Sequence, residues 1–158
     1  MLNESIRETL RPIGLLLVRV VAGATMIYGH GWGKFQKFIS GDWTFADPLM
    51  IGEGIQKVQN WIGFDFWLTD PIGFGEGLSL TLAAGAEFVA ALLVVLGLAT
   101  RISALPLVIT MLVAALIFHA GDPFGDKELP LIYATIFLSL FFTGPGEYSL
   151  DYRFGLEE

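Results

Sequence analysis

Cysteine is absent from the 158 residues of this chain. The side chains therefore offer no disulfide, no thiolate metal site and no means of holding an iron–sulfur cluster. A redox role, if the protein has one, must use a bound cofactor or a partner protein.

Charge is also scarce, and basic charge most of all. Only 16% of the residues are charged and 54% are apolar, whereas a soluble domain has about 25% charged residues. The formal net charge of -7 argues against nucleic-acid binding, because that function needs basic surface to neutralise phosphates. It argues equally against docking to anionic lipid through a polybasic patch. We therefore expect an integral membrane protein.

Long apolar runs are what the chain has in place of charge. A membrane helix needs about 20 mostly apolar residues, and four segments approach this length, at about residues 12–29, 78–98, 102–120 and 129–143. We predict an all-α fold in which residues 1–158 form one membrane domain, a four-transmembrane-helix bundle. A compact soluble helical protein is disfavoured, because four such runs leave too little polar surface to cover them.

Residues 31–77 differ from the rest, since they hold all four tryptophans and six acidic residues. Tryptophan prefers the membrane–water interface. Four apolar residues fall on one face of a helix, namely Ile51, Ile55, Val58 and Ile62. We predict a long interfacial loop between helices 1 and 2, with an amphipathic segment on one membrane face. An ordinary loop whose tryptophans pack internally is the alternative.

Four spans would place both termini on one side of the membrane. The basic residues divide equally between the two sides, so their number does not decide the orientation. Arg7, Arg11 and Arg101 flank the spans closely, and this favours cytoplasmic termini in the inner (plasma) membrane of the cell.

Two ionisable residues stand well inside the apolar runs. A charge at membrane depth costs at least about 2.5–3.5 kcal/mol on insertion scales and usually faces a partner inside the bundle. Counting about 1.5 Å per residue along each helix, Arg19 and Glu87 come close enough in depth for an ion pair. Such a pair would either lock the bundle or line a site or proton path.

Two histidines share the opposite rim. Counted in the same way, His30 and His119 both lie about 27 Å from the face that carries the termini, and Lys34 follows His30 by one helical turn. We expect this rim to hydrogen-bond a quinone headgroup. Histidines without a ligand, bis-histidine haem ligation and a metal site with nearby carboxylates are the alternatives. The candidate cofactor-binding residues are thus His30, Lys34, His119, Arg19 and Glu87, with no catalytic or metal-ligating residue assigned.

Several segments together resemble a known family. They are LLLVRVVAG around Arg19, YGHGWGKF with His30 and Lys34, LAAGAEFVAALLVVLGLATRISAL with Glu87, LIFHAGDPFG with His119, and the closing GPGEYSLDYRF. In these residues the chain resembles the DoxX family of small four-helix membrane proteins, which includes the DoxD-type subunits of quinone-linked oxidoreductases. The loop at about residues 40–77 is longer than the family pattern.

The resemblance implies a membrane component linked to quinone reduction or sulfur-compound oxidation. We therefore expect a membrane subunit associated with a quinone-linked oxidoreductase, with a protein partner in a membrane complex and quinone rather than haem as its cofactor. The alternative is a non-catalytic structural or assembly subunit of a larger complex. A small-solute transporter is a third interpretation, but no inverted pair of broken helices is evident.

Overall fold

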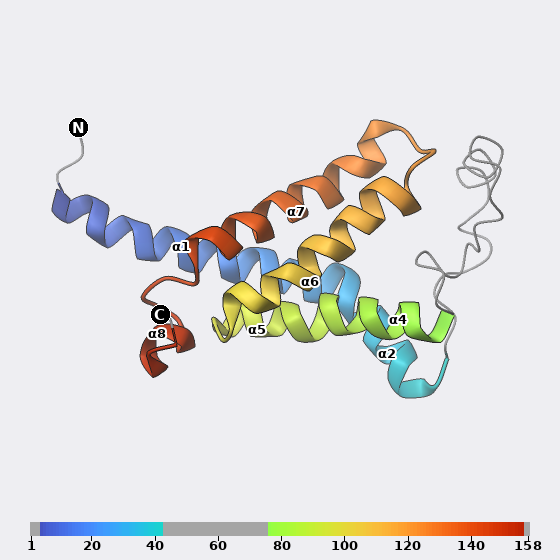
Figure 1. Cartoon of the computed structure of the whole chain (residues 1–158), viewed down its shortest axis with the longest axis horizontal. Helices are drawn as coiled ribbons and strands as arrows, with labels where there is room; N and C mark the ends of the chain where they lie inside the picture. The colour runs from blue at the N-terminus through green and yellow to red at the C-terminus, as the bar shows by residue number, and fades with distance from the viewer. Residues whose placement is uncertain (1–3, 43–75, 157–158) are drawn as a thin grey trace.

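The computed structural model describes residues 4–42 and 76–156, which form helices and turns without a strand. Four long helical stretches alternate in direction along the chain (Figure 1). The first joins α1 (Glu4–Met26), η1 (Ile27–Gly31) and α2 (Trp32–Ser40), and the second joins α4 (Glu76–Ala84), η2 (Gly85–Ala90) and α5 (Ala91–Leu96). The third joins α6 (Thr100–Val113) and η3 (Ala114–Phe118), the fourth is α7 (Phe124–Thr143), and the short α8 (Leu150–Phe154) follows. The all-α prediction is confirmed.

Two of the helical stretches are long and apolar enough to cross a membrane, Glu8–Ser40 and Thr100–Phe118, and Leu80–Leu96 is a shorter apolar helix. The outer faces of the two long stretches carry large apolar side chains that are 58% to 73% exposed: Leu17, Val21, Ile102, Ile109 and Leu116. Soluble proteins rarely leave such faces bare, whereas lipid covers them. The four-span count stays a prediction.

The first helix is longer than predicted at both ends. It begins at Glu4 and continues without a break to Ser40, so the predicted start of the loop at Gly31 is wrong. Gly29, Gly31 and Gly33 lie inside the helix, which ends only at Gly41, whose φ of 74° reverses the chain. The predicted amphipathic segment at Ile51–Ile62 lies outside the described residues.

The bundle core lies where α1, α5, α6 and α7 meet. Met26, Val94, Leu107, Phe137 and Leu140 are fully buried there, and alanines fill the space between them. Small residues let helix backbones approach closely, which is the usual basis of helix packing in membranes.

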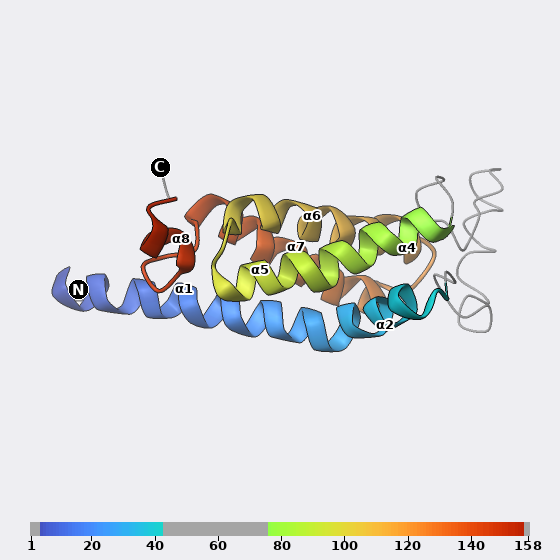
Figure 2. The ribbon, with the colours of Figure 1, turned by 90° about the horizontal axis from the view of Figure 1, so that it is seen from below.

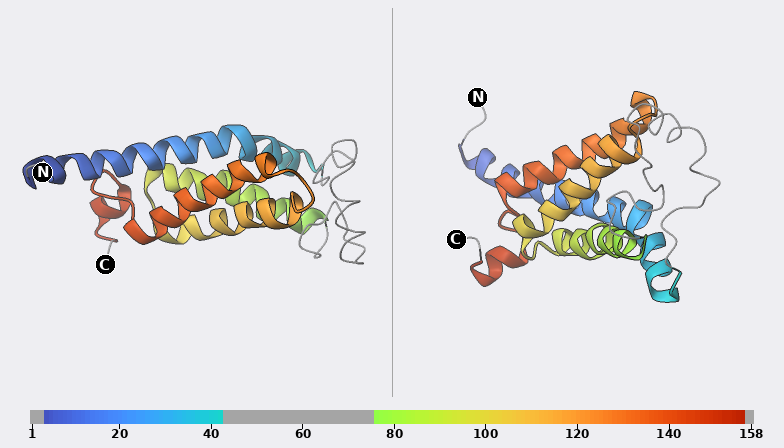
Figure 3. Two further views of the ribbon diagram at one scale, coloured as in Figure 1. Left: turned by 90° about the horizontal axis from the view of Figure 1, so that it is seen from above. Right: turned by 45° about the vertical axis from the view of Figure 1, so that its right-hand side comes forward.

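Both described ends of the chain lie at one end of the bundle (Figure 2). The ends of α2 and α4 lie at the other, as the two views of Figure 3 also show. We call these the terminal end and the loop end. They carry two different polar clusters.

Candidate functional site

A buried ion pair joins the first two helical stretches towards the loop end. The Nζ atom of Lys34, in the first turn of α2, donates to Oε2 of Glu87 in η2. The Glu87 side chain is 5% exposed and that of Lys34 is 24% exposed. The pair therefore has one fully enclosed member and one that a ligand can reach. With His30 it forms a cluster that we call the Glu87 site.

The ion pair forms because two π-helical segments face each other. Gly31, the last residue of η1, is buried against the backbone of η2. A Cβ atom at Gly31 would overlap the Glu87 carbonyl oxygen and would lie 2.9 Å from the Phe88 nitrogen. A π-helical turn adds a residue to the helix and is frequent at functional sites. Here it brings the backbones of two charge-bearing turns into direct contact.

The third member of the site, His30, lies in η1 beside the pair. Both Glu87 and Lys34 act electrostatically on its ring. The ring also meets Tyr133 of α7 edge to face, with 6.1 Å between centroids. The members of the Glu87 site therefore come from the first two helical stretches, and the fourth contacts the site through Tyr133.

An aromatic wall forms where α2 meets η2, from residues that adjoin Lys34 and Glu87 in the sequence. Phe35 of α2 and Phe88 of η2 stack with their centroids 4.1 Å apart and their planes 8° apart. The Trp32 ring lies 5.9 Å from that of Phe88 and is half exposed. Aromatic rings and hydrogen-bonding groups thus occur together where the first two helical stretches meet, a combination found in small-molecule sites.

Arg19 does not join this site, so the predicted Arg19–Glu87 pair is wrong. Its guanidinium donates to backbone carbonyls from beyond α7, with Nη1 2.8 Å from the Pro145 oxygen and Nη2 2.5 Å from the Tyr148 oxygen. The Arg19 side chain is buried, with 2% exposed. Its partners are backbone groups of a loop that folds in against α1, and counting depth along two helices could not reveal them.

The same loop caps the third helical stretch. The Asp151 carboxylate accepts from the amides of Ala99 and Thr100 at 2.6 Å and 2.9 Å, where α6 begins with no cap of its own. The Asp151 amide donates to the Gly97 carbonyl at 2.8 Å. Gly97 has a φ of 70°, and a Cβ there would lie 2.6 Å from the Cβ of Ser149. Arg19, Asp151 and backbone residues 97–100 and 145–149 form what we call the C-terminal clamp.

Asp151, which interacts electrostatically with Arg19, was not among the residues singled out from the sequence. Its signal lay in the Ser149-Leu150-Asp151 sequence after the Gly-Pro-Gly turn. Ser149 caps α8 by accepting from the Tyr152 amide, and this short helix positions the carboxylate.

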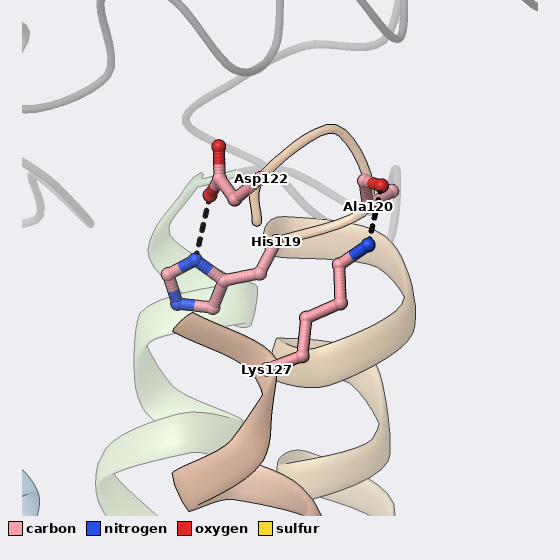
Figure 4. Close-up of polar contacts among 4 residues, drawn as sticks. All are labelled: His119, Ala120, Asp122 and Lys127. Atoms are coloured by element: carbon pink, nitrogen blue, oxygen red, sulfur yellow. Dashed lines mark hydrogen bonds and ion pairs between the residues drawn. The ribbon is translucent and has the colours of Figure 1, made fainter. Parts of the chain in front are cut away.

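His119 has its own local partners, shown in Figure 4. Its Nδ1 atom lies 2.8 Å from Oδ2 of Asp122, and the nearby Lys127 ammonium donates to the Ala120 carbonyl at 2.7 Å. Among the residues that the structure describes, no hydrogen bond, ion pair or ring contact joins His119 to His30. The structure therefore groups His30, Lys34 and Glu87, and it places Arg19 and His119 elsewhere.

Comparison with known proteins agrees with the resemblance noted in the sequence. The DoxX family model matches residues 14–120, more than half of the chain. An uncharacterized protein of Haemophilus influenzae is 28% identical over an alignment that covers 93% of this chain and 95% of that protein. No solved structure matches. The matched region holds every residue of the Glu87 site and also Arg19, and the chain belongs to the DoxX family of membrane proteins.

Proposed function

We propose that the protein is a membrane subunit associated with a quinone-linked oxidoreductase, and that the Glu87 site receives the quinone headgroup. The observation that carries this proposal is the Lys34–Glu87 ion pair between the facing π-helical segments. Ionisable residues inside membrane helices are expensive and mark ligand sites or proton pathways. Membership of the DoxX family supports the proposal, since the family includes quinone-linked subunits.

The chemistry of the site suits a quinone. A quinone has a flat apolar ring and two carbonyl oxygens that accept hydrogen bonds. The Lys34 ammonium has three N–H groups, of which Glu87 takes one. Another can reach a carbonyl oxygen, with His30 as a second donor. The ring would lie against the aromatic wall of Phe35 and Phe88.

Reduction of the quinone to a quinol takes up two electrons and two protons. The electrons would come from the partner oxidoreductase. Histidine exchanges protons near neutral pH more readily than other side chains, so His30 is placed to pass the two protons to the quinone oxygens one after the other, and it would be reprotonated each time by water from the loop end. Glu87 keeps the ammonium of Lys34 oriented.

The local contacts of each candidate residue support a smaller set of quinone ligands than the sequence did. Both terminal nitrogens of Arg19 donate to backbone carbonyls. The Nδ1 atom of His119 is hydrogen-bonded to Asp122. We therefore retain His30, Lys34 and Glu87 as quinone ligands and leave the other two out.

A thermal-shift titration of the purified protein with a water-soluble quinone analogue tests this assignment. His30→Ala should weaken the apparent affinity about three- to tenfold, because one hydrogen bond to the ligand is lost. His119→Ala is the matched control and should bind as the wild type does. Each variant should melt within a few degrees of the wild type, because neither histidine belongs to the bundle core.

Two results would contradict the proposal. Equal weakening by both histidine variants, or by neither, would remove His30 as a specific ligand. If the analogue fails to stabilise the wild type at any concentration, the structural or assembly subunit becomes the better interpretation.

We also propose that the protein lies in the inner membrane with both termini in the cytoplasm. The shared position of the two ends (Figure 2) supports a common side, and the flanking arginines support the cytoplasmic one. Single cysteines can be introduced as Ser5→Cys or Ser40→Cys into this cysteine-free chain. An impermeant thiol reagent on intact cells should label only the second variant, and labelling of only the first would reverse the orientation.

A further inference from the structure

A cavity of about 670 Å³ opens at the terminal end, where α1, α6 and α7 leave the bundle. Its wall carries two arginines and two glutamates, Arg11, Arg101, Glu8 and Glu147, together with Tyr152 and Leu15. It lies at the opposite end of the bundle from the Glu87 site, so what it binds is independent of the proposed function.

The four charged side chains of this cavity are not paired with one another. The ion pairs Lys34–Glu87 and His119–Asp122 lie elsewhere, and neither involves the cavity. Arg101 lies over the backbone of Gly144, where a Cβ would be 3.3 Å from its Nη2 atom. The lack of a side chain at Gly144 therefore leaves space for the Arg101 guanidinium beside the cavity. Two cations and two anions are available to a ligand.

The position of the cavity matches the headgroup layer of a membrane. Leu15 lies in the apolar run of α1, Arg101 lies in the first turn of α6, and Thr143 ends α7. Aromatic residues of the neighbouring chain end, Tyr148, Tyr152 and Phe154, are more than half exposed. Such residues gather at membrane interfaces.

We propose that this cavity binds the headgroup of a zwitterionic phospholipid that carries a primary ammonium, such as phosphatidylethanolamine. The guanidinium groups of Arg11 and Arg101 hold the phosphate, since arginine matches phosphate geometry. The carboxylates of Glu8 and Glu147 accept from the ammonium. The acyl chains then lie along the bare apolar face of α1, which includes Leu17 and Val21.

The charges select this headgroup over the common alternatives. An anionic headgroup would satisfy the arginines but leave two carboxylates facing added negative charge. A choline headgroup is zwitterionic, but its quaternary nitrogen has no N–H group to donate. A headgroup with a phosphate and a primary ammonium complements both the two arginines and the two carboxylates of the cavity.

The test is lipid retention by the full chain. The protein is reconstituted with equimolar phosphatidylethanolamine, phosphatidylglycerol and phosphatidylcholine of identical acyl chains, extracted gently, and the lipids that remain are counted by native mass spectrometry. Phosphatidylethanolamine should be retained about three- to tenfold over each of the others, the effect expected from one or two charge-assisted contacts in a partly open site.

Variants identify the contacts. Arg11→Gln and Arg101→Gln should each reduce retention of phosphatidylethanolamine. The double variant Glu8→Gln/Glu147→Gln should shift the preference to phosphatidylglycerol, because the cavity becomes positive. Arg153→Gln is the matched control, since this exposed arginine lies outside the cavity, and it should retain the wild-type preference. Circular dichroism of each variant checks the fold.

Three results would overturn the proposal. The first is equal retention of the three lipids by the wild type. The second is a preference that survives both arginine substitutions. The third is displacement of the lipid by free phosphoethanolamine in excess, which would identify a soluble phosphate compound as the ligand.

Discussion

Replacing Arg19 with alanine is expected to lower the free energy of unfolding by about 2–4 kcal/mol, because one buried and one partly buried carbonyl oxygen lose a charged donor. The Pro145 and Tyr148 carbonyls accept from this one side chain, and the clamp encloses it almost completely. The Asp151 carboxylate also loses its neighbouring positive charge. Arg19→Lys should be intermediate, since one ammonium has no planar fork to reach both carbonyls.

Reversible unfolding in mixed micelles, followed by far-ultraviolet circular dichroism, measures this effect. Arg153→Ala removes an exposed arginine and should change stability by no more than about 0.5 kcal/mol. If Arg19→Ala proved as stable as this control, the clamp would not hold the bundle together. Amide exchange gives a second measure: Ala99 and Thr100 should exchange faster in the Arg19 variant if the clamp opens as a unit.

The second large effect is expected at the buried ion pair. Glu87→Gln or Lys34→Met should each lower the free energy of unfolding by about 2–4 kcal/mol, somewhat less than for a fully buried pair because Lys34 is partly exposed. Removing one partner leaves the other charge uncompensated between two apolar helices. The double variant avoids that cost, so it should lose less than the sum of the single variants.

A double-mutant cycle on the same unfolding assay measures the coupling, which should be about 1–3 kcal/mol for Lys34 and Glu87. A parallel cycle with Arg19→Ala and Glu87→Gln supplies the comparison. Those two residues share no hydrogen-bond partner, and their effects should add to within about 0.5 kcal/mol. Additive effects of Lys34 and Glu87, together with coupled effects of Arg19 and Glu87, would contradict the Lys34–Glu87 pair. They would support the Arg19–Glu87 pair that was predicted from the sequence.

The helices were predictable because apolar runs are a strong signal. The four predicted segments overlap the four observed helical stretches, although the second and third stretches end at Leu96 and Phe118, two residues before the predicted ends. The end of the first helix was not predictable from composition. Gly29, Gly31 and Gly33 favour a break in isolation, yet a glycine is required where η1 touches η2. The favourable packing of Trp32 and Phe35 on Phe88 outweighs their weak helix propensity.

Lys34, Glu87 and His30 were among the five candidate residues from the sequence, but the Lys34–Glu87 ion pair was not predicted. Glu87 stood out because a carboxylate inside an apolar run demands a partner, and Lys34 and His30 were recognised as polar neighbours at one rim. Counting residues along a helix gives height but not which neighbouring helix a side chain faces. The partners of Arg19 were beyond this method, because they are backbone carbonyls and every residue carries one.

The C-terminal clamp has a consequence for the biogenesis of the protein. Arg19 enters the membrane with the first helix, whereas Pro145, Tyr148 and Asp151 are synthesised only after the fourth. Until then the guanidinium needs water or lipid phosphate as a substitute partner, and the first amides of α6 lack their cap. The first helix therefore completes its polar contacts only when the last part of the described chain has folded back onto it.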